Sequence, residues 1–132
     1  MSDLKLFVPE KKKTTGRRND KLASQIREAF SMALAKGDFP ILPNHEEDSK
    51  LKTPVTITYV DLSPDLRNAT IYFMPLGGLL INETCRFFEL QTHYFKNVIA
   101  TKMKIRYIPN IIFRADESFE YSKKIESLLE HS

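Results

Sequence analysis

The feature that most constrains the fold is a pair of β-branched segments on either side of a short polar link. Residues 55–60 read VTITYV and residues 69–74 read ATIYFM, and both have the composition and alternation of β-strands. The link, residues 61–68, contains Ser-Pro-Asp turn chemistry and is too short to hold a crossover helix. The two segments are therefore expected to pair as an antiparallel hairpin.

Helical patterns flank this hairpin. Over residues 19–36 the apolar side chains recur at steps of three and four, which predicts an amphipathic helix that Gly37 is well placed to end. A second helical pattern begins near residue 82, but its apolar stripe shifts phase at 91–93. Either one long helix bends there or two helices meet. A short terminal helix is predicted over 119–129.

The stretch 94–113 is both apolar and basic, and it contains no acid. Its first part continues the helical pattern and includes Lys96. Its period then changes to two, so that Lys104 and Arg106 would share one face of a strand while apolar residues fill the other. Pro109 cannot donate to a ladder and therefore marks an edge position or a bulge of that strand.

These elements predict an α+β domain with the order helix, strand, strand, helix, helix, strand, helix, and with helices on one face of a small sheet. The chain of 132 residues is long enough for one domain. That domain is expected over 16–132, after a flexible basic tail at 1–15. Residues 38–54, with three prolines and the acidic run 46–48, are expected to form a long loop that is functional or mobile.

Composition excludes several classes of protein. No apolar run is long enough to span a membrane, and the charged N-terminus does not read as a signal peptide. The single cysteine, Cys85, excludes an internal disulfide and fits a reducing cytoplasm. A cytoplasmic location is therefore expected.

The distribution of charge predicts a partner of opposite sign. The net charge is only +3, but residues 1–36 hold nine Lys and Arg against four acids, and 94–114 hold five against none. Such segregation favours a basic face that binds a polyanion, although solvated helix faces can also be basic. The residues expected to contact phosphates are Arg17, Arg18, Lys21, Arg27, Lys96, Lys102, Lys104 and Arg106. Arg106 could alternatively pair with an acid such as Glu89 or Asp61.

No catalytic, cofactor or metal constellation is visible. There is no Cys/His zinc spacing, phosphate loop or nucleophile elbow. The histidines His45, His93 and His131 fall in a loop, a helix junction and the C-terminal tail. Cys85 has no base beside it and reads as a small core residue. An enzyme is not expected, and neither a cofactor nor a metal is.

Several short strings occur in an informative order. They are Lys21-Leu22-Ala23 with Ile26 after a basic helix start, Val55-Thr56 with Val60, Ser63-Pro64-Asp65-Leu66, Ala69-Thr70-Ile71-Tyr72-Phe73, Lys104-Ile105-Arg106-Tyr107-Ile108-Pro109-Asn110-Ile111, and the end from Ser118 to Leu129. Together, over residues 17–130, they resemble the bacterial ribosome-binding factor A family. The most specific string is the one containing Pro109, which looks like the family's basic-apolar-Arg-x-x-Pro pattern.

The resemblance implies a KH-like domain of the second type, with a mixed three-stranded sheet backed by helices. It also implies a monomeric, non-catalytic assembly factor of the small ribosomal subunit. Such a factor would bind free or immature subunits through their rRNA and aid late processing of the rRNA 5′ end.

The chain departs from its relatives at the junction between helices. KH domains generally clamp a nucleotide backbone with a GxxG loop, and no glycine lies between the helices here. The family's Ala-x-Gly kink falls on Gln91, Thr92 and His93, and neither flanking residue matches.

Two other functions stay open. The acidic run 46–48 and the acidic C-terminal helix would suit an adaptor that docks ribosomal proteins. A general single-strand RNA binder would stack bases on an exposed sheet face, but Tyr59, Tyr72 and Phe73 are predicted to be shared with the core.

Overall fold

The computed structural model describes residues 17–118. Its elements are α2 (Arg17–Lys36), β1 (Val55–Leu62), β2 (Asn68–Pro75), a 3-10 turn η2 (Leu76–Gly78), α3 (Ile81–Leu90), α4 (Thr92–Lys102) and β3 (Asn110–Ala115). The tail predicted at 1–15 and the helix predicted at 119–129 lie outside these residues, so the proposed domain limits stay predictions. The order of the described elements is the predicted one.

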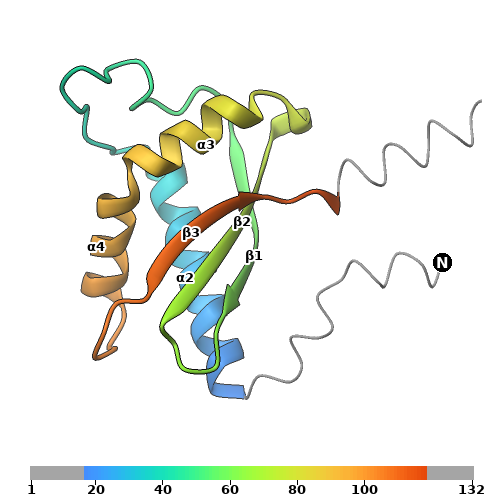
Figure 1. The fold of residues 1–132 in the computed structure, drawn as a ribbon, viewed down its shortest axis with the longest axis vertical. Helices are drawn as coiled ribbons and strands as arrows, with labels where there is room; N and C mark the ends of the chain where they lie inside the picture. The colour runs from blue at the N-terminus through green and yellow to red at the C-terminus, as the bar shows by residue number, and fades with distance from the viewer. Residues whose placement is uncertain (1–16, 119–132) are drawn as a thin grey trace, which may run out of the picture.

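The three strands form one mixed sheet in the order β1-β2-β3 (Figure 1). β1 and β2 pair antiparallel, as their short link requires, and Val60 lies opposite Ile71. β2 and β3 pair parallel, with Asn68 opposite Asn110, because the chain returns through α3 and α4 before it enters β3. The α+β class and the small mixed sheet are therefore confirmed.

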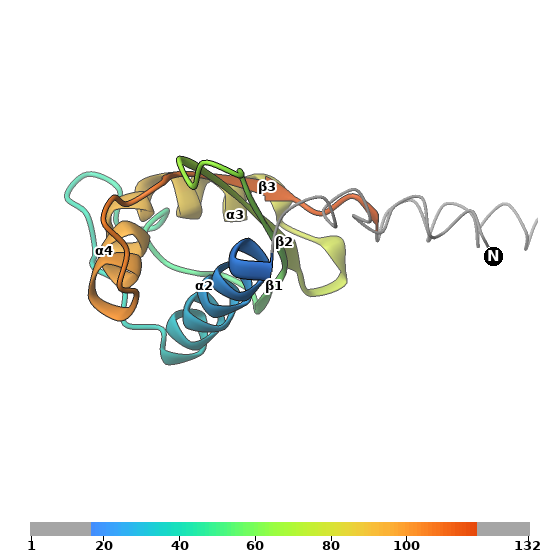
Figure 2. The same cartoon turned by 90° about the horizontal axis from the view of Figure 1, so that it is seen from below.

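The described helices α2, α3 and α4 pack on one face of this sheet (Figure 2). The buried residues they share with the sheet include Ile26, Phe30 and Leu34 from α2, Phe87 and Phe88 from α3, Phe95 and Ile99 from α4, and Ala69, Ile71 and Phe73 from β2. Phe88 lies at the centre of this core, where its ring centre is 4.2 Å from that of Phe113 in β3 and 4.9 Å from that of Phe73. Burial of each such ring contributes on the order of 2–3 kcal/mol.

The outer face of the sheet carries the tyrosines. Tyr59 and Tyr72 lie opposite each other across β1 and β2, with ring centres 6.1 Å apart, and both are half-buried. Alternation along β2 turns Tyr72 away from the helices and Phe73 towards them. The prediction that these aromatics belong to the core is right for Phe73 and wrong for the two tyrosines.

The strand predicted to carry Lys104 and Arg106 begins only at Asn110, so this assignment is wrong. The alternation itself is real, since Met103 and Ile105 pack against the core while Lys104 and Arg106 are exposed. However, β2 first pairs with β3 where Asn68 meets Asn110, and therefore offers no ladder partner to the preceding residues. Residues 103–109 form a connection that is extended at Met103 and bends at Arg106 and Tyr107.

Candidate nucleic-acid interface

Three segments meet at one end of the domain, drawn at the bottom of Figure 1. They are the start of α2, the turn between β1 and β2, and the loop between α4 and β3. Asn19 Nδ2 donates to the carbonyl oxygen of Ser63 at 3.1 Å, which ties α2 to the turn. The N–H of Asn110 donates to the carbonyl oxygen of Arg67 at 2.8 Å, which ties the loop to the same turn. We call this region the basic end and define it by Lys21, Arg67, Lys102, Lys104 and Arg106.

The turn between β1 and β2 is held by its own side chains. Ser63 Oγ donates to Asp65 Oδ1 at 2.7 Å, and the same carboxylate oxygen accepts the N–H of Arg67 at 3.1 Å. The hydrogen bond from Ser63, followed by that from Arg67, holds the pKa of Asp65 below its usual value. Leu66 completes the turn in the left-handed region, with φ 62°. The Asp65 carboxylate is thus hydrogen-bonded within the turn, and the Arg67 side chain is exposed to solvent.

Arg67 was missed by reasoning from the sequence. Its only signal there is its position at the end of a Ser-Pro-Asp turn, far from the other cations along the chain. The contact between this turn and the loop before β3 is what brings it to the basic end.

Two grooves open at the basic end. The larger, about 860 Å³, lies between the turn and the loop and is lined by Arg67, Lys104 and Arg106 among others. The smaller, about 500 Å³, separates α2 from Lys102, Met103 and Lys104. Lys104 lines both grooves, so it stands between them.

The cations of the basic end have no ion-pair partners within residues 19–118. All five are exposed. Arg106 instead places its guanidinium carbon 5.9 Å from the ring centre of Tyr107. Glu89, one of the acids considered as a partner for Arg106, lies 3.7 Å from Arg86. These charges are therefore available to an external anion.

Two of the predicted phosphate contacts lie apart from this region. Because an α-helix turns about 100° per residue, Arg27 points about 120° away from Lys21 around α2. The face of α2 that borders the smaller groove carries Leu22, Gln25, the acid Glu28, Ala29 and Met32 instead. Lys96 is half-buried on α4 and lines neither groove. Lys21 also lines neither groove, but it is exposed and lies two residues after Asn19, whose side chain is bonded to the turn. Arg17 and Arg18 begin α2, and their side chains lie outside the described part of the chain.

The junction between α3 and α4, unlike the basic end, has polar side chains that are bonded within the protein. Two helices meet there, because Gln91, with φ −99° and ψ 14°, leaves helical geometry. Thr92 Oγ1 donates to the carbonyl oxygens of Phe88 and Glu89 at 3.0 and 3.1 Å, which satisfies the end of α3. His93 is exposed, whereas Gln91 is only 1% exposed.

Gln91 fixes the long loop 38–54 to the junction. Its Nε2 donates to the carbonyl oxygens of Pro40 at 2.8 Å and of Ser49 at 3.1 Å. Ser49 is also buried, and its Oγ accepts the N–H of Leu42 at 3.0 Å while donating to the carbonyl of His45 at 2.7 Å. The loop is therefore an ordered part of the fold.

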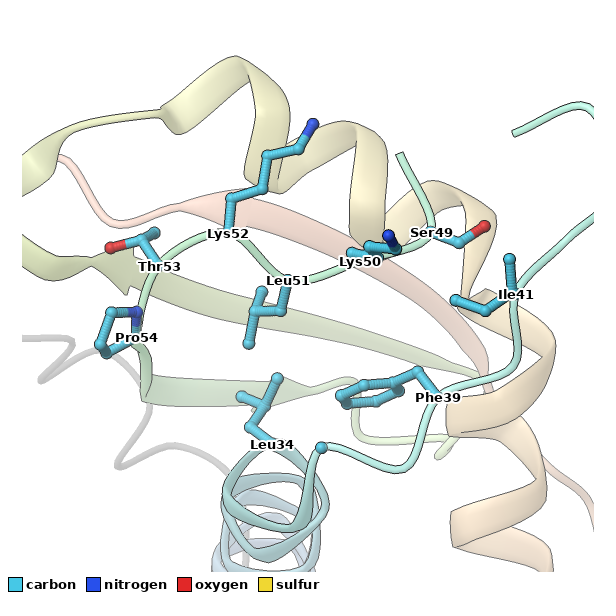
Figure 3. Close-up of a pocket in the computed structure, with 10 residues that line it drawn as sticks. Leu34, Phe39, Ile41, Ser49, Lys50, Leu51, Lys52, Thr53 and Pro54 are labelled. Atoms are coloured by element: carbon cyan, nitrogen blue, oxygen red, sulfur yellow. The ribbon is translucent and has the colours of Figure 1, made fainter. Parts of the chain in front are cut away.

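Apolar side chains of the same loop pack beneath it. The ring of Phe39 lies 4.9 Å from that of Phe87 and 4.8 Å from that of Tyr94. Figure 3 shows Phe39, Leu51 and Leu34 around a pocket of about 580 Å³ on the side of the loop that faces α2.

Two of the acids of this loop pair with nearby cations. Asp48 lies 3.7 Å from Lys52 and 3.6 Å from Arg86, and Glu47 lies 3.4 Å from Lys50. Such pairs at the surface contribute little stability. They do neutralise much of the negative charge that an adaptor would offer to a basic protein.

Comparison with known proteins shows the family of the chain. The sequence model of ribosome-binding factor A matches residues 18–129. The chain belongs to the ribosome-binding factor A family. It is 35% identical to ribosome-binding factor A of Beijerinckia indica over 111 residues, which cover 83% of this chain and 73% of that one. The homologue from Nitrobacter winogradskyi is 33% identical over 123 residues, with coverage of 92% and 84%.

Solved structures of this family share the fold. The crystal structure of ribosome-binding factor A from Thermus thermophilus superposes with a TM-score of 0.56 at 17% identity, covering 73% of this chain and 92% of that one. A Thermotoga maritima protein solved by NMR gives 0.56 at 27% identity, with coverage of 72% and 83%. The sheet order and the crossover through two helices agree with the KH-like type II fold.

The remaining chemistry within residues 17–118 is sparse. No cluster of three or more His, Cys, Asp or Glu side chains there is arranged to hold a metal. Burial, and to a lesser degree the Glu89 carboxylate, raise the pKa of the Cys85 thiol, which makes it a poor nucleophile. None of the helices in this range is both long and apolar enough to cross a membrane.

Proposed function

We propose that this protein is a non-catalytic assembly factor of the small ribosomal subunit. It binds free or immature subunits through their rRNA and aids late processing of the rRNA 5′ end, as a cytoplasmic monomer without a cofactor. Its family membership supports this, since its relatives are named as ribosome-binding factors. The observation that carries the role of rRNA is the set of exposed cations that three separate segments bring to the basic end, with no ion-pair partner among residues 19–118.

Contacts of this kind have a characteristic energetic signature. Lysine and arginine that neutralise phosphates release condensed counterions, so affinity falls steeply as salt rises. Phosphate contacts fix orientation on the RNA and carry little sequence information. Selectivity therefore comes from the shape of the RNA that fits the turn, the loop and the start of α2 together.

The test is a double charge reversal, Lys104→Glu with Arg106→Glu, assayed by co-sedimentation with immature small subunits over a range of salt. Loss of two phosphate contacts lowers the slope of log affinity against log salt by about 1.4–1.8. We expect affinity at low salt to fall about a hundredfold.

The matched control is Lys36→Glu with Lys50→Glu. It changes the net charge by the same amount at exposed positions outside the basic end. The control should bind like the wild type. If the first variant binds immature subunits with unchanged affinity and salt slope, the basic end does not carry the function.

A further inference from the structure

Tyr107 is the unusual aromatic of this domain. It is 76% exposed, whereas the other aromatic side chains between residues 19 and 118 are buried or half-buried. Its neighbour Ile108 is 43% exposed. A large flat ring in open solvent, next to cations, is a feature of surfaces that bind single-stranded nucleic acid.

The loop that carries Tyr107 is held on both sides. Met103 and Ile105 pack against the core before it. Pro109 is buried after it, and the N–H of Asn110 is bonded to the turn. Tyr107 therefore lies at the apex of a short anchored segment, which limits the entropy lost when a ligand is bound.

The larger groove lies beside this ring. Its volume of about 860 Å³ falls within the usual range of about 300–1,000 Å³ for sites that take a small molecule or a single chemical group. Arg67, Lys104 and Arg106 supply cations, and Asn110 supplies an exposed side-chain amide. The acid in the lining, Asp65, is held by Ser63 and by the N–H of Arg67.

We propose that Tyr107 stacks on an unpaired base of the bound RNA, while Lys104, Arg106 and Arg67 contact the phosphates on either side. This rests on the proposed function and names the class of RNA bound at the basic end. The guanidinium of Arg106 lies over the Tyr107 ring, so a base on that ring brings its own phosphate close to the cation. The site is distinct from the helix junction, where KH domains usually hold nucleotides.

An unpaired nucleotide fits these observations better than a duplex or a protein. Bases inside an A-form helix are stacked on each other and present no free face to an aromatic ring. Protein interfaces are depleted of lysine, whereas here Lys104 lines the same groove as the exposed ring.

The experiment compares Tyr107→Ala with the conservative variant Tyr107→Phe. The probe is a short single-stranded oligoribonucleotide that contains the fluorescent base 2-aminopurine, whose emission is quenched on stacking. A hairpin duplex of matched length is measured in parallel. The control variant is Leu79→Ala, which truncates a side chain that is also mostly exposed and lies outside the basic end.

We expect Tyr107→Ala to bind the single strand roughly tenfold more weakly, the usual effect of losing one stacked base. Quenching should disappear, while the salt slope and the duplex affinity should not change, because no phosphate contact is removed. Tyr107→Phe should retain quenching and bind within about twofold of wild type, since the ring face is kept. The urea midpoint should be the same for all variants.

Two outcomes overturn the inference. One is an unchanged single-strand affinity and quenching in Tyr107→Ala, and the other is an equal loss on the duplex. If either occurs while Lys104→Glu with Arg106→Glu still weakens binding as expected, only the stacking role fails. If the charge reversal also binds normally, the proposed function fails with it.

Discussion

The helix junction and the basic end differ in where their polar side chains find partners. At the junction, Gln91 is buried and its amide is satisfied by two backbone carbonyls of the chain's own loop. At the basic end, cations such as Lys104 and Arg106 are exposed and have no ion-pair partner among the described residues. Buried polar groups need hydrogen-bond partners inside the protein, whereas exposed cations can bind an anion from outside it. The contrast supports a structural role for the junction and the binding role proposed for the basic end.

The largest expected effect is that of Gln91→Ala. It leaves the carbonyls of Pro40 and Ser49 without their donor in a buried site, which should lower the free energy of unfolding by about 3 kcal/mol. Urea denaturation measures this, and RNA affinity of the folded protein should stay at the wild-type value.

The control for Gln91→Ala is His93→Ala, an exposed neighbour that should change stability by less than about 0.5 kcal/mol. A Gln91→Ala protein of normal stability but weakened RNA binding would reverse the assignment of the junction.

Ser49→Ala should have the second largest effect and lower the free energy of unfolding by about 2 kcal/mol. The substitution removes both the acceptor of the Leu42 N–H and the donor to His45 within a buried part of the loop. Ser24→Ala on the exposed face of α2 should instead be neutral or slightly stabilising, because alanine is the better helix former. Equal unfolding midpoints for the two variants would show that the loop does not depend on Ser49.

A third comparison tests whether RNA binding depends on the side of α2 that carries Lys21 or on the side that carries Arg27. Lys21→Glu, at the basic end, should weaken RNA binding about tenfold and reduce the salt slope by about 0.7–0.9. Arg27→Glu carries the same charge change on the other flank and should have less than a twofold effect. Fluorescence anisotropy across a salt series measures both, and equal losses would extend the RNA surface around the helix.

The smallest effect concerns Asp65 and pH. Its folded pKa is lowered by the Ser63 hydroxyl and the Arg67 N–H, so its stabilising contribution is present above the unfolded pKa of about 3.9. That contribution is lost as pH falls through the lower folded value. The difference in stability between wild type and Asp65→Asn should therefore shrink on acidification. A difference that is constant from neutral to acid pH would contradict this.

Local patterns predicted much of the fold. The hairpin, α2 and the break near 91–93 all follow from periodicity and turn residues within short windows. The position of β3 did not, because it depends on the register in which Asn68 meets Asn110 across the whole α3–α4 crossover. Residues 103–109 show that alternation predicts which side chains, here Met103 and Ile105, pack against the core, but not that the segment has a neighbouring strand.

The candidate site was predictable only in part. Its cations on α2 and around α4 stand out by charge, whereas Arg67 joins them through one backbone contact to Asn110. The role of Gln91 was equally hidden, because its partners lie 51 and 42 residues away along the chain. No window around residue 91 contains that information.

The parallel pairing of β2 with β3 has a consequence for when the proposed RNA-binding groove forms during folding. Contacts across a long connection are reached late in folding, because the entropy of closing the loop is lost before the contacts form. The groove beside Tyr107 depends on the bond between Asn110 and Arg67, which belongs to this pairing. If the basic end binds RNA as proposed, a chain in which β3 has not yet docked would display its cations without the groove and would attract RNA by charge alone. Discrimination between RNA shapes would then require the docked strand.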